Sequence, residues 1–237
     1  MTMTIFSISD LHLSCGDKPM DVFGDQWTGH ASRIEEDWIS RVRGRDIVLL
    51  PGDLSWAMRF EDAIPHIEYI GRLPGRKIII KGNHDFWWSS LSRLRDHLPQ
   101  GMYAIQNDCL FLDGILFSGS RGWSLPAEQT EASDKKIFAR ELIRLEMSLS
   151  SARKLSSDAP LICMTHFPPL TPQLLDTDVT ALLEKYNVNF LIYGHLHGAS
   201  LKNAFNGTHN GVSYRCASCD GLDFKLAEIL DVECAGQ

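Results

Sequence analysis

The sequence has little of what marks a membrane, secreted or nucleic-acid-binding protein. No apolar run approaches the ~20 residues that a membrane-spanning helix requires. The first ten residues, MTMTIFSISD, contain no basic side chain, so we expect no signal peptide. The formal net charge is -7, with 23 basic against 30 acidic residues, which gives no general attraction for nucleic acid or for an anionic membrane. We therefore expect a cytoplasmic protein without a membrane or nucleic-acid partner. The sequence leaves the oligomeric state open.

Cysteines and linker-like segments are also scarce. The six cysteines are too sparse for the disulfide scaffold of a small secreted domain, and we expect reduced thiols. Cys216 and Cys219 form a lone CxxC pair, which we interpret as ordinary strand and turn thiols in preference to a redox or zinc site. Apolar residues make up 44% of the chain, enough for a sizeable core, and no Gly, Pro or Ser cluster separates two parts. We predict a single domain over residues 1–237.

Apolar runs and amphipathic segments alternate along the chain. In the first half they predict strands at 4–9, 46–50 and 77–81 and helices at 32–42 and 61–72. Such a βαβαβ run favours parallel strands with covering helices and places active residues at the carboxyl ends of the strands.

The second half is less regular. It predicts a hairpin at 109–119, helices near 133–155 and 178–185, and strands at 161–166, 190–195, 212–217 and 225–230. We expect these strands to form a second sheet that packs face to face with the first.

Five short polar clusters each follow an apolar, strand-like run: IFSISDLH, IVLLPGDLS, IIIKGNHD, LICMTH and FLIYGHLH. They supply seven nitrogen or oxygen ligand candidates and no thiolate: Asp10, His12, Asp53, Asn83, His166, His195 and His197. In an extended chain, the i, i+2 spacing of Asp-x-His and His-x-His points both side chains to the same side. Seven ligands are too many for one tetrahedral ion but suit two divalent cations if one carboxylate bridges them. The inventory therefore predicts a two-metal site.

The ordered set of motifs resembles the calcineurin-like metallophosphoesterase superfamily. The motifs are Asp10-x-His12, Gly52-Asp53, Gly82-Asn83-His84-Asp85, His166 and Gly194-His195-x-His197. Each is weak alone, but all five in order, each after a strand, make a strong match. The resemblance implies an α/β fold, a four-layer sandwich of two mixed β-sheets flanked by helices, with a dinuclear metal site at the carboxyl ends of the strands.

The resemblance also implies a role for each ligand. The first metal would be held by Asp10, His12 and His197, the second by Asn83, His166 and His195, and Asp53 would bridge the two. Imidazole and carboxylate ligands accept several metals, so we expect Mn, Fe or Zn.

The charge of such a centre suits phosphate esters. Two dications carry +4 and the carboxylates of Asp10 and Asp53 return -2, which leaves a positive centre in an acidic protein. Two metals roughly 3.5–4 Å apart can ionise a bridging water near neutral pH and clamp the phosphoryl oxygens. We predict a metal-dependent phosphoesterase that uses this bridging hydroxide to attack a small phosphorylated substrate.

His84 is the one imidazole of the motifs that has no metal to hold. The resemblance implies that it donates a proton to the leaving group, and that Asp85 holds the ring and raises its pKa. Proton donation of this kind is typically worth ~10²–10⁴ in rate. The alternative is a buried histidine bonded to Asp85 for stability alone.

Departures from the motifs of better-known branches of this superfamily narrow the range of expected substrates. The chain has GDLSWAMRF and KGNHD where protein Ser/Thr phosphatases have GDxVDRG and RGNHE, so the paired arginines of that branch are missing. Trp56 stands where purple acid phosphatases place a metal-bound tyrosine, and an indole offers only a donor. We expect a small bacterial-type phosphomonoesterase or phosphodiesterase acting on a nucleotide or similar small organic phosphate.

The remaining assignments stay open between two interpretations. Arg121 and Trp123 offer an anion clamp and a stacking surface for substrate, or an exposed arginine beside a core tryptophan. For the aromatic run Phe86–Trp88 we favour packing at a helix start over substrate stacking. The whole site has two alternatives: a non-catalytic metal-binding scaffold of the same fold, and a single-metal hydrolase in which Asn83 and His166 are structural.

Overall fold

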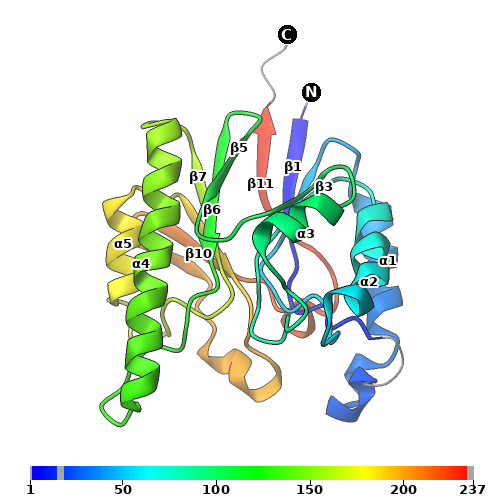
Figure 1. Cartoon of the computed structure of the whole chain (residues 1–237), viewed down its shortest axis with the longest axis horizontal. Coiled ribbons are helices and arrows are strands. Elements are labelled where there is room, and N and C mark those ends of the chain that lie inside the picture. The colour runs from blue at the N-terminus through cyan, green and yellow to red at the C-terminus, as the bar shows by residue number, and fades with distance from the viewer. Residues whose placement is uncertain (1, 15–18, 234–237) are drawn as a thin grey trace. The chain divides into compact units, whose positions relative to one another are not determined.

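The computed structural model describes residues 2–14 and 19–233 of the chain. Contacts divide the chain into two compact units, the first comprising residues 1–104 and 217–237 and the second residues 105–216. Each unit contains one mixed β-sheet and the helices that flank it (Figure 1). The predicted α/β class with two mixed sheets is therefore confirmed, while the stacking of the sheets and the single domain over 1–237 stay predictions.

The sheet of the first unit has the strand order β11-β1-β2-β3-β4. Its strands are β1 (Thr2–Ser7), β2 (Ile47–Leu50), β3 (Arg76–Ile79), β4 (Met102–Ala104) and β11 (Ala227–Glu233). The first four are parallel, and β11 pairs antiparallel with β1 at the edge. The unit's helices are α1 (His30–Arg41), α2 (Phe60–Arg72) and α3 (Leu91–His97), with short 3-10 turns at Met20–Phe23, Asp25–Trp27 and Cys219–Leu222.

The central strand β2 of the first unit is buried on both faces. In β2, Val48 and Leu50 share a core cluster with Ile34 and Trp38, which lie one turn apart on α1. The alternate residues of the strand are fully buried as well, so all four positions of the run IVLL are apolar. Continuous apolar runs are typical of parallel strands that bury both faces.

The sheet of the second unit has the strand order β5-β6-β7-β8-β10-β9. Its strands are β5 (Cys109–Leu112), β6 (Ile115–Ser120), β7 (Leu161–Thr165), β8 (Phe190–Tyr193), β9 (Gly207–His209) and β10 (Val212–Cys216). The four central strands are parallel, and β5 and β9 pair antiparallel at the two edges. The unit's helices are α4 (Ala132–Leu155) and α5 (Asp178–Lys185), with a 3-10 turn at Gly198–Asn203.

The carboxyl-terminal strand corrects one expectation. The strand expected at 225–230 was assigned to the second sheet, but β11 pairs with β1 and completes the first sheet. The short elements α3, β4 and β9 had not been expected, because three to seven residues carry too little periodicity to identify.

The described cysteines are free thiols, as expected, and Cys216 and Cys219 are both buried. Cys15 and Cys234 lie outside the described residues. Within residues 2–14 and 19–233, no helix combines the length and apolar character needed to cross a membrane.

Candidate metal centre

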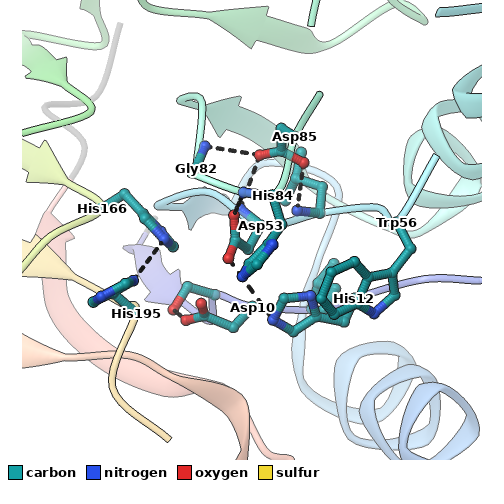
Figure 2. A network of polar contacts seen from close by, with 12 residues as sticks. Asp10, His12, Asp53, Trp56, Gly82, His84, Asp85, His166 and His195 are labelled. Atoms are coloured by element: carbon teal, nitrogen blue, oxygen red, sulfur yellow. Dashed lines mark hydrogen bonds and ion pairs between the residues drawn. The ribbon is translucent and has the colours of Figure 1, made fainter. Parts of the chain in front are cut away.

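Three neighbouring parallel strands of the first unit end in predicted site residues. Asp10 and His12 follow β1, Asp53 follows β2, and Asn83 and His84 follow β3. Because parallel strands place their carboxyl ends on one edge of the sheet, Asp10, His12, Asp53 and His84 lie together there (Figure 2).

The backbone at three of these residues is left-handed. The φ angles are 61° at Asp10, 44° at His12 and 53° at Asp53, a region that residues other than glycine rarely adopt. Two hydrogen bonds hold the loops in this state: Asp10 N–H donates to Gly52 O (3.0 Å) and His12 N–H donates to Asp53 O (3.0 Å). The expectation that an extended chain carries the Asp-x-His pair is therefore wrong. A conformation that costs of order 1–3 kcal/mol per residue is typical of functional sites.

The side chains of these three residues form a buried, anionic cluster. Asp10, His12 and Asp53 are each at most 3% exposed. His12 Nε2 lies 3.8 Å from Asp53 Oδ2, and Asp10 has a ligand atom within 4.8 Å of one on His12 and within 4.8 Å of one on Asp53. The Ser9 hydroxyl donates to the Asp10 carboxylate. Buried carboxylates need a compensating positive charge, so this set of oxygen and nitrogen donors fits a divalent cation.

Asp85 connects the loops after β2 and β3. Its Oδ2 accepts hydrogen bonds from the backbone N–H groups of Asp53 (2.8 Å) and Gly82 (2.8 Å). Its Oδ1 accepts from the backbone N–H groups of Leu54 (2.9 Å) and Ser55 (3.3 Å).

The indole N–H of Trp87 donates to Asp85 Oδ1 (2.9 Å), and this is the fifth hydrogen bond that the Asp85 carboxylate accepts. A carboxylate has about four lone-pair sites, so these donors fill the acceptor capacity of a fully buried group (Figure 2). Asp85 thus positions the backbone of both loops. The expected contact in which Asp85 orients the His84 ring stays a prediction.

Gly82 and Asp53 approach closely for a related reason. A Cβ atom on Gly82 would overlap the Asp53 carboxylate and the Asp53 backbone nitrogen. Only glycine leaves room for the two loops to meet there. The requirement is close approach, because Gly82 is not among the residues with positive φ.

His84 lies in an aromatic environment beside the cluster. Its backbone N–H donates to Asp53 Oδ1 (2.7 Å), while its half-buried ring is 4.6 Å from Trp56 and 5.7 Å from His12, measured between ring centroids. Trp56 also stacks on His12 at 4.6 Å and 21°. The neighbouring Asn83 is half-buried.

In the second unit, the predicted residues follow β6, β7 and β8, which are parallel neighbours. His166 Nε2 lies 3.3 Å from His195 Nδ1 (Figure 2). The Phe167 ring packs on His195 at 4.2 Å between centroids. This unit thus contributes a pair of imidazoles that an aromatic ring supports.

The His195-x-His197 pair also departs from the extended conformation. His195 is left-handed, with φ of 74°, whereas His197 is extended. His197 begins the 3-10 turn Gly198–Asn203: its N–H donates to Ser200 Oγ (2.8 Å), and the Ser200 hydroxyl donates to His197 O (2.7 Å). The two imidazoles are therefore positioned by different local structures.

Arg121 makes contacts in the second unit through both its backbone and its side chain. Its carbonyl oxygen accepts the N–H groups of His166 (2.9 Å) and Phe167 (3.1 Å). Its guanidinium lies 4.7 Å above the Trp123 ring and 3.6 Å from the buried Glu141. Burial lowers the pKa of this guanidinium, and Glu141 opposes that shift. These contacts favour the structural interpretation of Arg121 and Trp123, and their contact with substrate stays a prediction.

The aromatic run after β3 divides between core and surface. Trp87 and Trp88 belong to the core of the first unit, whereas Phe86 is 56% exposed. The expectation that these two tryptophans pack is confirmed. The hydrogen bond from Trp87 to Asp85 also anchors the loop.

The sequence interpretation missed four residues around the site. Ser9 and Cys219 contact Asp10, the latter by an S–H donor to its carbonyl oxygen (3.1 Å). Trp56 and Phe167 pack against predicted ligands. Adjacency to a motif could have pointed to Ser9, Trp56 and Phe167, but Cys219 is 209 residues from Asp10.

Comparison with known structures identifies similar folds. A crystal structure of a protein of unknown function from Aquifex aeolicus is similar at a TM-score of 0.53 and 18% identity, covering 95% of each chain. A purple acid phosphatase from yellow lupin (Lupinus luteus) seeds matches at a TM-score of 0.38 and 14% identity, over 83% of this chain and 38% of that one. The first likeness shows the fold alone. No curated protein matches the sequence.

The sequence profile of the calcineurin-like phosphoesterases matches residues 3–199, which include all the predicted ligands. That match supports a metal-dependent hydrolase of phosphate esters in general. By this match over most of its length, the chain belongs to the calcineurin-like phosphoesterase family.

Proposed function

We propose that the chain is a dinuclear metallophosphoesterase acting on small organic phosphates. The observation that carries this proposal is the buried cluster of Asp10, His12 and Asp53, whose left-handed backbones are held by hydrogen bonds between loops. A protein that did not use this cluster would gain nothing from strained, buried anions.

In this proposal the ligands divide as the family resemblance implies. Asp10, His12 and His197 would hold one divalent cation, Asn83, His166 and His195 would hold the second, and Asp53 would serve both. When bound, the two cations supply a water of lowered pKa and neutralise the charge on the phosphoryl oxygens. The contact between the His166 and His195 imidazoles, at 3.3 Å, supports their assignment to one ion.

His84 supplies the proton that the leaving oxygen needs. Its ring is only half-buried, and its backbone is fixed to the Asp53 carboxylate, which places the imidazole beside the ligand cluster. The Trp56 ring, 4.6 Å away, limits the directions that the imidazole can take. In this account Trp56 and the loop backbone orient His84, and the predicted contact of its ring with Asp85 would add to them.

The test is to compare leaving groups in the wild type and His84→Asn. With Mn²⁺-loaded protein, we expect His84→Asn to lower kcat/KM for alkyl phosphates by ~10²–10⁴, because an alkoxide must be protonated as it leaves. Nitrophenyl esters should lose much less, because nitrophenolate leaves without a proton. Equal losses for both classes would contradict proton donation by His84.

Metal content tests the dinuclear part separately. Two equivalents of Mn²⁺ per chain are expected at saturation, and one equivalent would indicate a single-metal hydrolase. Protein that binds metal but hydrolyses neither mono- nor diesters would be a scaffold, and the proposal would fail.

A further inference from the structure

A pocket lies between α1 and α2 in the first unit. It has a volume of about 560 Å³ and is lined by residues of α1, α2 and the segment that precedes α1. Those that the argument uses are Asp21, Trp27, His30, Glu35, His66 and Tyr69. We call it the α1–α2 pocket. Its volume falls in the range of sites for small organic molecules.

Two lining residues of the α1–α2 pocket connect it to the residues around His84. Its lining includes Leu13, the residue after the predicted ligand His12, and Met20, whose sulfur accepts the indole N–H of Trp56 (3.1 Å). The Trp56 ring in turn contacts both His12 and His84. Trp56 therefore lies between His84 and a lining residue of the pocket, and the pocket is the space that a group leaving with the oxygen protonated by His84 would enter beyond this ring.

The described lining of the pocket is negatively charged. It includes the carboxylates Asp21 and Glu35, and among the described lining residues none is a lysine or arginine; residues 15–18 lie outside the described part of the chain. Burial lowers the pKa of His30 and of His66, and it raises the pKa of Tyr69 to about 12, so these three side chains are neutral near pH 7. A second phosphate or carboxylate on the ligand would meet the carboxylates of Asp21 and Glu35.

The hydrogen-bonding groups in the pocket favour a ligand that carries hydrogen-bond donors. The Tyr69 hydroxyl donates to Glu35 Oε2 (3.0 Å). A carboxylate accepts about four hydrogen bonds, so Glu35 has capacity for an amine or hydroxyl of a ligand. Arg33, the nearest arginine on α1, is directed to Asp223 at 2.7 Å and does not line the pocket.

From this geometry we infer that the α1–α2 pocket receives the alcohol part of the phosphate ester and selects an uncharged or cationic group with amine or hydroxyl donors. The inference rests on the proposed function, which supplies the ester, and it names the class of leaving group. Esters that carry a second anionic group on the alcohol are disfavoured.

The first test uses three matched probes: 2-aminoethyl phosphate, propyl phosphate and 2-carboxyethyl phosphate. With Mn²⁺-loaded protein, we expect kcat/KM for the carboxyethyl ester to be at least about tenfold below that for the aminoethyl ester, because of the charge of Glu35. Glu35→Gln should reduce this ratio, and Glu35→Lys should reverse it. Glu36→Lys is the matched control, since Glu36 is exposed, neighbours Glu35 on α1 and does not line the pocket.

The second test separates the pocket from catalysis. Adenosine, a neutral ring compound with amine and hydroxyl donors, is titrated into metal-free protein while NMR signals of Trp27 and Tyr69 are followed. We expect saturable shifts that Ser32→Trp abolishes and Ser32→Ala keeps, because Ser32 is an exposed residue of the pocket's lining.

The outcomes distinguish the two proposals. Saturable adenosine binding without hydrolysis of any ester would leave the pocket as a binding site for amine and hydroxyl donors, but it would contradict the proposed function and the pocket's role toward an ester. Hydrolysis of all three probes at equal kcat/KM, or shifts that Ser32→Trp leaves unchanged, would overturn the pocket while the phosphoesterase stands.

Discussion

The two units position their candidate ligands by different means. In the first unit, carboxylates and one imidazole are fixed by left-handed backbones and by hydrogen bonds between loops, of which those of the Asp53 loop and Gly82 converge on Asp85. In the second unit, the imidazoles pack against the Phe167 ring, which itself packs on Trp123, and one backbone carbonyl holds the loop. A charged carboxylate needs directional donors, whereas a neutral imidazole offers apolar faces that packing can hold. Four substitutions test this difference.

The largest effect is expected at Asp53. Replacing this carboxylate in Asp53→Asn keeps the shape but removes the charge that two cations would share. We expect kcat/KM to fall by more than ~100-fold, beyond the 10–100-fold typical of supporting residues, with loss of one metal equivalent. Activity and metal content are measured on the same preparation. Asp96→Asn, an exposed carboxylate on α3, is the control and should change neither quantity.

Asp85→Asn should have the next largest effect. An amide presents two N–H donors where backbone N–H groups already point, so several buried donors lose their acceptor. We expect the metal-free protein to lose ~3 kcal/mol of unfolding free energy, measured by urea titration. Metal affinity should fall ~10–100-fold in calorimetric titrations. If Asp85→Asn unfolded at the same urea concentration as Asp96→Asn, Asp85 would not organise these loops.

Gly82→Ala tests the close approach of the two loops. The added methyl group must displace the Asp53 backbone or carboxylate, which should cost ~1–3 kcal/mol of stability. We expect metal affinity to fall about tenfold, less than in Asp85→Asn, because the hydrogen bonds can re-form after a small shift. Gly114→Ala leaves its new methyl group in open space, but its φ of 80° introduces strain. It therefore controls for backbone strain without steric overlap, and equal metal affinity in the two variants would contradict the overlap argument.

The smallest effect is expected in the second unit. Phe167→Leu removes ring contacts with His166, His195 and Trp123 but leaves the backbone bond to Arg121. Aromatic pairs contribute ~0.5–1.5 kcal/mol beyond their burial, so metal affinity should fall less than about tenfold. A larger loss than in Asp85→Asn, measured under the same conditions, would reverse the comparison between the units.

Much of the fold could be predicted from local sequence patterns. The strands β1, β2 and β3 and the helices α1 and α2 follow from apolar runs and amphipathic spacing, which short windows reveal. The pairing of β11 with β1 could not be predicted in this way, because it joins residues more than 200 positions apart, as in the contact between Thr4 and Asp231. The sequence of an edge strand of mixed polarity does not indicate which sheet the strand will join.

The candidate site, like the fold, has features that the sequence predicts and features that it does not. By itself, the sequence determined which side chains follow the strands and that their chemistry suits divalent cations, because motif residues and apolar runs are adjacent in the chain. Only the tertiary structure decided how they are held. The left-handed φ angles at Asp10 and Asp53, and the partners of Asp85 from a loop 32 residues away, exist because folding brings separate loops within hydrogen-bond distance. Such contacts leave no periodicity in the sequence, since each depends on backbone groups that every residue has.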